Sequence, residues 1–310
     1  MQFFRLTIFM KYIVRKVIKG RSYYYFQYQD HTKLVGDSLP TNLDQLKKNF
    51  GQFFKDIAKK EYFQLPDAVR QEFRFGDLNT LETLHYSHVL LYHDLFKKEF
   101  DNFYEEFIKL FTYHSNKSEG SKTTKKAIDR FASRRIRVPR TKTEKEIFNS
   151  FLAFNFAFSK EMKWNMKSIK HIHALLLNGL DPIIAGQWKK EDNVAPGNQP
   201  TISHKGVSAA MKALIAWLKA EFRKKTMYPP KLALHFYVKF EAIHPFLDGN
   251  GRVGRILLNA LLKKFNYPPI IFFSENHQQH SSSIQKALEG RWDKMNKHFL
   301  EQVKKTDHAL

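Results

Sequence analysis

The chain contains no cysteine. This absence excludes disulfide frameworks, thiolate zinc sites, iron–sulfur clusters and cysteine nucleophiles, and it fits a reducing compartment. Long apolar runs are also missing, because the apolar stretch at residues 1–14 is interrupted by Arg5 and Lys11 and is too short to span a bilayer. No secretory cleavage signal is evident. We therefore expect a cytoplasmic protein with no membrane partner.

Acidic residues are scarce relative to basic ones, with 30 Asp and Glu against 52 Lys and Arg and a net charge of +22. This balance favours acidic partners such as nucleotides, nucleic acids or anionic lipid surfaces. The chain is also 43% hydrophobic, which disfavours intrinsic disorder. Its 310 residues fit one large domain with a small appendage. The absence of a repeat of 20 to 50 residues argues against solenoids and propellers.

The first 40 residues have a β-strand pattern. An apolar segment precedes Lys19-Gly20, and an aromatic run at residues 23–28 follows it. This order predicts a small β meander over residues 12–39. For the tyrosines, a strand that packs on a helix is favoured over a base-stacking platform for nucleic acid.

Helical periodicity begins after residue 40. Thr41 is a candidate N-cap, and apolar stripes predict further helices between residues 78 and 110 and over 148–158. Residues 181–207 are rich in Pro and Gly, which predicts a loop or hairpin. The basic run at 122–140 is interpreted as a solvated helix and loop. We divide the chain into a β-rich segment (1–40), a helical region (41–120) and a main domain (121–310).

The most informative stretch is HPFLDGNGRVGR at residues 244–255, which lies between two helical stripes. Its glycines fit a dinucleotide fingerprint, but that motif requires a preceding strand and a following alternation of strands and helices. A P-loop would need a hydroxyl ligand for magnesium at the position of Ile256. The remaining interpretation is a loop and helix N-terminus that hold phosphates, surrounded by a histidine, a carboxylate and two arginines.

This stretch resembles the signature of the Fic (Fido-fold) family, H-P-F-x-D/E-G-N-G-R-x-x-R, at every defined position. The resemblance covers residues 101–300. It implies a mainly α fold, in which a Fic helical core carries a short β-hairpin flap and the N-terminal β meander and helices are added. It also implies transfer of AMP from ATP to a protein hydroxyl.

The residues of the loop suit that chemistry. A neutral imidazole at His244 can take the proton from an attacking hydroxyl. Asp248 offers a hard oxygen for Mg²⁺ or Mn²⁺ that is otherwise held by water and phosphates. Gly249 and Gly251 permit positive φ, and their amides, together with the Asn250 side chain, are interpreted as donors to the α-phosphate.

Two arginines and three apolar residues complete the loop. Arg252 and Arg255 share a helix face and are interpreted as a clamp on the β- and γ-phosphates. Pro245 is expected to stiffen the loop, while Phe246 and Leu247 are expected to anchor it by facing the core.

A second motif, SNKSEG at residues 115–120, resembles the inhibitory motif of the family, S/T-x-x-x-E-G/N. Its defined positions are Ser115, Glu119 and Gly120. The resemblance implies that Glu119 pairs with Arg255 and forces ATP into an unproductive pose. Two further possibilities stay open: a polar helix end with Gly120 as its C′ residue, and a role of Glu119 in removing attached AMP.

The turn-rich interval corresponds to the flap of the family, which aligns a target segment by strand addition. Its candidate residues are Gln199, Pro200, Thr201, Ile202, Ser203 and His204. Ile202 is expected to be the main apolar contact. Two departures from the family pattern are Trp188-Lys189, where an aromatic–arginine pair is common, and HSSS at 280–283, where tyrosines often line the base pocket. They make phosphate binding a stronger expectation than a preference for adenine.

The sequence thus predicts a protein adenylyltransferase that modifies a Ser, Thr or Tyr hydroxyl of a target or of itself, with ATP as substrate. One alternative is a Fic-fold enzyme that removes AMP or transfers another nucleotide, phosphocholine or phosphate. The other is a basic nucleic-acid-binding regulator that uses the net charge. The sequence leaves open whether the protein forms a homodimer.

Overall fold

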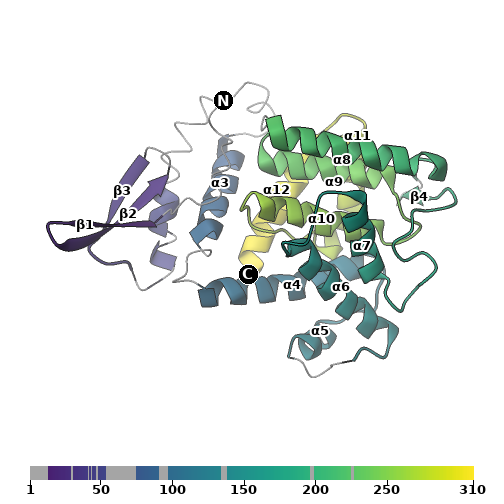
Figure 1. The fold of residues 1–310 in the computed structure, drawn as a ribbon, viewed down its shortest axis with the longest axis horizontal. Helices are drawn as coiled ribbons and strands as arrows, with labels where there is room; N and C mark the ends of the chain where they lie inside the picture. The colour runs from purple at the N-terminus through teal and green to yellow at the C-terminus, as the bar shows by residue number, and fades with distance from the viewer. Residues whose placement is uncertain are drawn as a thin grey trace. The chain divides into compact units, whose positions relative to one another are not determined.

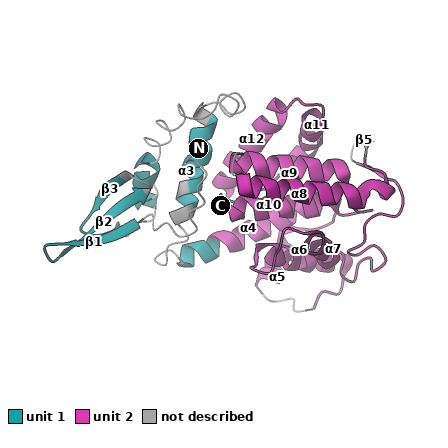
Figure 2. Ribbon diagram, turned by 45° about the horizontal axis from the view of Figure 1, so that its top comes forward, with its two compact units in different colours: residues 1–102, 266–268 teal, residues 103–265, 269–310 magenta. Residues whose placement is uncertain are grey.

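A computed structural model of the chain describes residues 13–28, 31–40, 42, 44–46, 48–53, 75–90, 97–133, 138–195, 199–224 and 227–310 (Figure 1). These residues fall into two compact units (Figure 2). The first comprises residues 1–102 and 266–268, and the second comprises residues 103–265 and 269–310. Thr41, proposed above as an N-cap, lies outside the described residues.

The first unit contains the predicted β meander. Its three strands are β1 (Ile13–Ile18), β2 (Arg21–Tyr28) and β3 (His31–Gly36), and they pair antiparallel in that order. Lys19 and Gly20, both with positive φ, form the turn between β1 and β2. Such a two-residue turn matches the right-handed twist of the strands that it connects.

The aromatic strand packs on a helix, as predicted. Phe26 of β2 is buried against Phe50 and Phe53, which belong to a helical segment at residues 48–53. Ile13 and Leu46 complete this small core. Helix α3 (Phe75–Leu90) also belongs to the first unit.

The second unit is helical, apart from one short hairpin. Helix α4 (Lys97–Ser118) leads into it, and its other helices are α5 (Lys125–Ala132), α6 (Lys142–Phe158), α7 (Met166–Leu176), α8 (Val207–Lys224), α9 (Pro229–Ile243), α10 (Asn250–Lys264), α11 (His277–Leu288) and α12 (Asp293–Ala309). The described residues therefore confirm a mainly α fold. The predicted hairpin is formed by β4 (Val194–Ala195) and β5 (Gln199–Pro200), which pair antiparallel.

Local signals fix where the helices around the site begin. The Thr141 hydroxyl accepts the backbone N–H of Glu144, whose carboxylate accepts the N–H of Thr141 in return, which makes a capping box at the start of α6. The Asn165 side chain caps α7 by accepting the N–H of Ser168. Both caps satisfy backbone donors that the helices themselves leave open.

Helices α9 and α10 form the centre of the second unit (Figure 1). Helix α9 packs against α8, α10 and α11, while α10 also contacts α6 and α7. Both helices are buried over most of their length because apolar residues occur on nearly every side of them. The turn that joins them is therefore held between two rigid elements. Within the described residues, no helix is long and apolar enough to cross a membrane.

A substitution of Phe154 in α6 tests the hydrophobic core that supports this turn. Its side chain is 1% exposed and lies against the rings of Phe107, Phe111 and Phe158. Replacing it with alanine should lower the free energy of unfolding by about 3–5 kcal/mol through lost contacts and a residual cavity. The exposed neighbour Asn155 provides the control, because Asn155→Ala should change stability by less than about 0.5 kcal/mol. Urea denaturation measures the free energy of unfolding of both variants. Equal losses of stability in the two variants would contradict the assignment of Phe154 to the core.

Candidate active site

The candidate base lies in a strained conformation between the two central helices. His244 ends α9 with a left-handed backbone (φ 50°), and its N–H donates to the carbonyl of Phe240 at 3.0 Å. A non-glycine residue rarely adopts this conformation, and such strain is concentrated at functional sites. The conformation reverses the chain at His244, so that the next residues form a loop before α10 begins.

Asn250 holds this loop closed. Its side-chain oxygen accepts the N–H of Phe246, and its amide group donates to the carbonyl of Phe246, both at 2.8 Å. The side chain therefore binds the backbone of its own loop, and its donation to an α-phosphate stays a prediction. Phe246 is fully buried, as expected, whereas Leu247 is 37% exposed and does not face the core.

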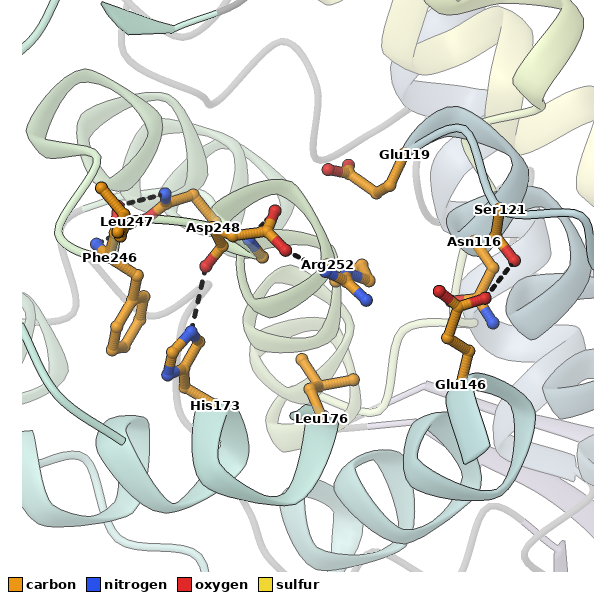
Figure 3. Close-up of polar contacts among 12 residues, drawn as sticks. Asn116, Glu119, Ser121, Glu146, His173, Leu176, Phe246, Leu247, Asp248 and Arg252 are labelled. Atoms are coloured by element: carbon orange, nitrogen blue, oxygen red, sulfur yellow. Dashed lines mark hydrogen bonds and ion pairs between the residues drawn. The ribbon is translucent and has the colours of Figure 1, made fainter. Parts of the chain in front are cut away.

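His173 of α7 braces the same loop from below (Figure 3). The N–H of Gly186 donates to its Nδ1 at 2.9 Å, so Nε2 carries the proton and donates to the carbonyl of Asp248 at 3.0 Å. The imidazole also stacks on the ring of Phe246, with 3.8 Å between the centroids. Burial lowers the pKa of His173 to about 4, which keeps this neutral tautomer.

Asp248 and Arg252 face each other across the start of α10 (Figure 3). Arg252 Nη2 donates to Asp248 Oδ2 at 3.0 Å, and the N–H of Gly249 donates to Oδ1. The side chain of Asp248 remains 61% exposed, whereas that of Arg252 is largely buried and its Nε has no hydrogen-bond partner among the residues that the structure describes. The pair thus offers an accessible carboxylate and an unsatisfied donor.

Gly249 is the residue that precedes α10 and has φ 77°, a conformation that favours glycine. Gly251, by contrast, lies within the first turn of α10 and has no positive φ, so this part of the prediction is wrong. The N-cap residue Gly249 has no side chain to cap α10, and the described part of the chain shows no side-chain cap hydrogen bond there. The first backbone N–H groups of the helix therefore point out of it as donors for an anion.

The predicted pair between Glu119 and Arg255 is present. Arg255 Nη2 donates to Glu119 Oε1 at 2.8 Å and to the carbonyl of Ser115 at 3.0 Å, while its Nε donates to the Ser115 hydroxyl at 3.1 Å. Arg255 is only 3% exposed. Burial raises the pKa of Glu119, but the attraction and the hydrogen bond of Arg255 outweigh this effect, so the net pKa is lowered.

Gly251 provides the space for this pair. A Cβ atom at this position would lie 2.5 Å from Glu119 Oε1 and 2.9 Å from Arg255 Nη1. The carboxylate of Glu119 therefore rests directly on the first turn of α10. A negative charge is favoured at a helix N-terminus, so this position stabilises the ionised form of Glu119.

The end of α4 places Glu119. The N–H of Ser121 donates to the carbonyl of Asn116, and the N–H of Gly120 donates to that of Lys117, with Gly120 at φ 77°. This is a Schellman ending with Gly120 at C′, so the helix-end and inhibitory interpretations of the motif are compatible. The Ser150 hydroxyl of α6 donates to Asn116 and anchors this ending.

A second buried carboxyl group lies close to the pair. Glu241 of α9 approaches Gly254, where a Cβ atom would lie 2.4 Å from Glu241 Oε1. Burial raises its pKa to about 8, helped by Glu119 and opposed by Arg255. Glu241 is therefore a neutral acid at pH 7, and Glu119 is left as the counter-ion of Arg255.

His244 is a free base at neutral pH. Burial lowers its pKa to about 4, and the positive charge of Lys189 adds to this effect. The imidazole thus carries no second proton and has a lone pair available. Its Nδ1 is buried without a hydrogen-bond partner among the described residues.

The flap residues lie beside this loop. Gln199 and Pro200 form β5, and Thr201 follows with its hydroxyl donating to the carbonyl of Asn193 at 2.7 Å. Ser203 and His204 both donate to Asp192, which fixes the turn after the hairpin. Ile202 is 40% exposed, as an apolar contact for a partner requires.

Sequence reasoning missed His173, Glu241 and Lys189. Two of these residues could have been noticed in the sequence. His173 shares the buried face of α7 with Ile169 and Ile172, and Glu241 is an acidic residue within the otherwise apolar α9. Lys189 was noted only as a departure from the aromatic–arginine pair of the family, and its burial was not expected, because a lysine in a polar loop is ordinarily solvated.

Residues 163–262 match the Fic/DOC family, and this range contains the whole loop from His244 to Arg255. This part of the chain is therefore similar to a Fic domain. Within it lie His173, Lys189, the flap, α9 and all but the last two residues of α10, whereas Glu119 precedes the matched range.

Part of this chain is also similar in sequence to known proteins. The chain is 30% identical over 136 residues to the protein adenylyltransferase Fic of Drosophila ananassae, covering 44% of this chain and 27% of that protein. It is 33% identical over 125 residues to the protein of that name from Culex quinquefasciatus, covering 40% of this chain and 25% of the relative. The chain therefore spans about a quarter of the length of these relatives.

Solved structures share the Fic fold. A Fic-domain signaling protein from Bacteroides thetaiotaomicron superimposes with a TM-score of 0.65 over 74% of this chain and 93% of its own, at 20% identity. Fic-1 from C. elegans gives the same TM-score and identity over 86% of this chain and 82% of its own. At this identity the likeness shows the fold alone, and it confirms the predicted fold class.

The pKa of His173 predicts how stability depends on pH. Its folded value of about 4 lies below the ordinary 6.5, so the unfolded chain binds the proton more readily. The stability present above pH 6.5 is therefore lost as the pH falls toward 4, and at pH 5 this group alone should cost about 2 kcal/mol. Urea unfolding at pH 7 and pH 5 should show a smaller loss for His173→Gln than for the wild-type chain. An equal loss in both would contradict the assignment.

Proposed function

We propose that the protein transfers AMP from ATP to the hydroxyl of a protein side chain, and that Glu119 inhibits this activity. The observation that carries the proposal is a Fic loop in which a neutral His244, an uncapped helix N-terminus and two arginines meet, while the carboxylate of Glu119 lies on the same helix turn. The similarity to proteins named adenylyltransferase supports the AMP group as the one transferred.

In this reaction His244 takes the proton of the attacking hydroxyl. The hydroxyl oxygen forms a bond to the α-phosphorus of ATP, the bond between that phosphorus and the bridging oxygen breaks, and pyrophosphate leaves. A general base contributes about 10²–10⁴-fold to such a rate. The left-handed backbone of His244 and the bracing of the loop by His173 hold the imidazole in place.

The start of α10 binds the phosphates. The amides of its first turn donate to negatively charged oxygens, and Arg252 adds a buried, unsatisfied Nε. Arg255 would contribute its guanidinium once Glu119 has left it. Held by this cradle, the triphosphate presents its α-phosphorus to the nucleophile.

Asp248 fits a magnesium or manganese site of the kind that nucleotides bring with them. Its carboxylate is hard and exposed, and the described residues contain no group of three or more His, Cys, Asp or Glu that would cage a metal alone. One carboxylate with water and phosphates is the usual setting for Mg²⁺. When bound there, the ion supplies charge neutralisation at the phosphates.

Glu119 inhibits by competition for Arg255 and for the helix turn. While its carboxylate holds both, ATP cannot place its terminal phosphate on Arg255, so the α-phosphorus stays out of line with the nucleophile. The flap, from Gln199 to His204, selects the target by adding a strand to its edge, with Ile202 as an apolar contact.

The direct test follows label from ATP. Glu119→Gly should raise self-labelling with α-labelled ATP at least about tenfold over the wild-type chain, because Arg255 becomes available to the triphosphate. Adding His244→Ala should remove at least about 99% of that label, because the base is lost. Intact mass should show additions of one AMP, and γ-labelled ATP should leave no label.

The outcomes separate the alternatives. Label from γ-labelled ATP would mean phosphate transfer, and no label in any variant would reject AMP transfer to the protein itself. Glu106 is a matched control, because it is an exposed glutamate on α4 that pairs with Lys109 on the same helix. Glu106→Gly should leave labelling at the wild-type level.

A further inference from the structure

Lys189 is a buried cation with an unusual set of partners. It is 4% exposed, and its ammonium group donates to Asn193 Oδ1 and to Thr201 Oγ1, both at 2.7 Å. Both acceptors are neutral side chains. Burial lowers the pKa of Lys189, and the nearby carboxylate of Asp192 only partly offsets this effect, so the buried ammonium group depends on its two hydrogen bonds.

Its two acceptors belong to the base of the flap. Asn193 precedes β4 and Thr201 follows β5, so the ammonium group bridges the two ends of the hairpin. The Thr201 hydroxyl in turn donates to the carbonyl of Asn193 at 2.7 Å. The two ends of the hairpin are therefore fixed to each other through one nitrogen atom.

The same residues also hold the catalytic loop. The backbone N–H of Lys189 donates to the carbonyl of Pro245 at 2.9 Å. The side-chain amide of Asn193 donates to the carbonyls of Phe246 at 3.0 Å and Leu247 at 3.3 Å. The three consecutive carbonyls after His244 are thus all bound by residues 189 and 193.

We propose that Lys189 is a positioning residue that sets the flap in register with the catalytic loop, so that a target segment on the flap meets His244. The inference rests on the function proposed above and adds the residue that aligns target and base. The positive charge of Lys189 also acts on His244 and favours its neutral form.

Lys189→Met tests the proposal, because methionine keeps much of the apolar stem but offers no donor and no charge. Amide hydrogen exchange at residues 193–201 and 246–247 should become about tenfold faster, the loss expected for hydrogen bonds from a charged group. Lys189→Arg, which keeps charge and donors, should restore exchange to within about threefold of the wild-type rate. The exposed neighbour Lys190 supplies the control, since Lys190→Met should change nothing.

Thr201→Val removes one acceptor without removing the lysine. It also removes the hydrogen bond from the Thr201 hydroxyl to the carbonyl of Asn193, so it should accelerate exchange in the same segments, and by a smaller factor in the Lys189→Met background than in the wild-type chain. Additive effects of the two changes would overturn the proposed link. Unchanged exchange in Lys189→Met would also overturn the proposal. Exchange in Lys189→Arg that is as fast as in Lys189→Met would overturn it as well.

The activity readout uses the Glu119→Gly background. There, Lys189→Met should lower the maximal rate of self-AMPylation at least about tenfold and change the KM for ATP less than about twofold, because alignment is lost and nucleotide binding is not. A rise in KM alone would contradict the positioning role. If Glu119→Gly transfers no AMP at all, the proposed function fails, while hydrogen exchange still decides the role of Lys189.

Discussion

The buried charge of Arg255 is the constraint on which the rest of the site depends. A guanidinium that is removed from water must be paired and hydrogen-bonded, because leaving such a charge unpaired costs several kcal/mol. In this structure Glu119 supplies the negative charge and Ser115 supplies further acceptors, whereas Glu241 brings no charge at pH 7 because burial raises its pKa to about 8. Arg255 therefore requires an anion, and either Glu119 or a phosphate meets that requirement.

Three separate parts of the chain place the carboxylate of Glu119 where it can pair with Arg255. The Schellman ending of α4 places Glu119, Gly251 leaves room for its carboxylate, and Asn116 is held to α6 through Ser150. Each part is weak alone: a helix end, a missing side chain and one hydroxyl. Together they fix the carboxylate at the N-terminus of α10, where an anion gains from the helix dipole as well as from Arg255.

The catalytic loop was predictable from the sequence because its residues are contiguous. The position of His244 between two helices, the anchoring by Phe246 and the pairing of Glu119 with Arg255 all follow from motifs that can be read in order. The N-terminal meander was predictable for a similar reason, since its strands are neighbours in sequence and pair in that order. Local pattern was sufficient in these cases.

Other features could not be predicted from the sequence, because they depend on the folded arrangement of the chain. The hydrogen bonds between the Asn250 side chain and the backbone of Phe246 form only once the loop is folded. Leu247 has an apolar side chain, yet the loop turns it outward. Lys189 is 56 residues from Pro245, whose carbonyl it binds, and no periodicity in sequence reports such a contact.

The central claim is that Glu119 and the terminal phosphate of ATP compete for Arg255. Isothermal titration of ATP and ADP against the wild-type chain and Glu119→Gln tests it directly, because glutamine keeps the shape of the side chain and removes its charge. In Glu119→Gln, ATP should bind at least about tenfold more tightly than ADP, the gain expected for a charge-assisted contact to one more phosphate. In the wild-type chain the two nucleotides should bind equally. The same ratio of affinities in both proteins would contradict the account.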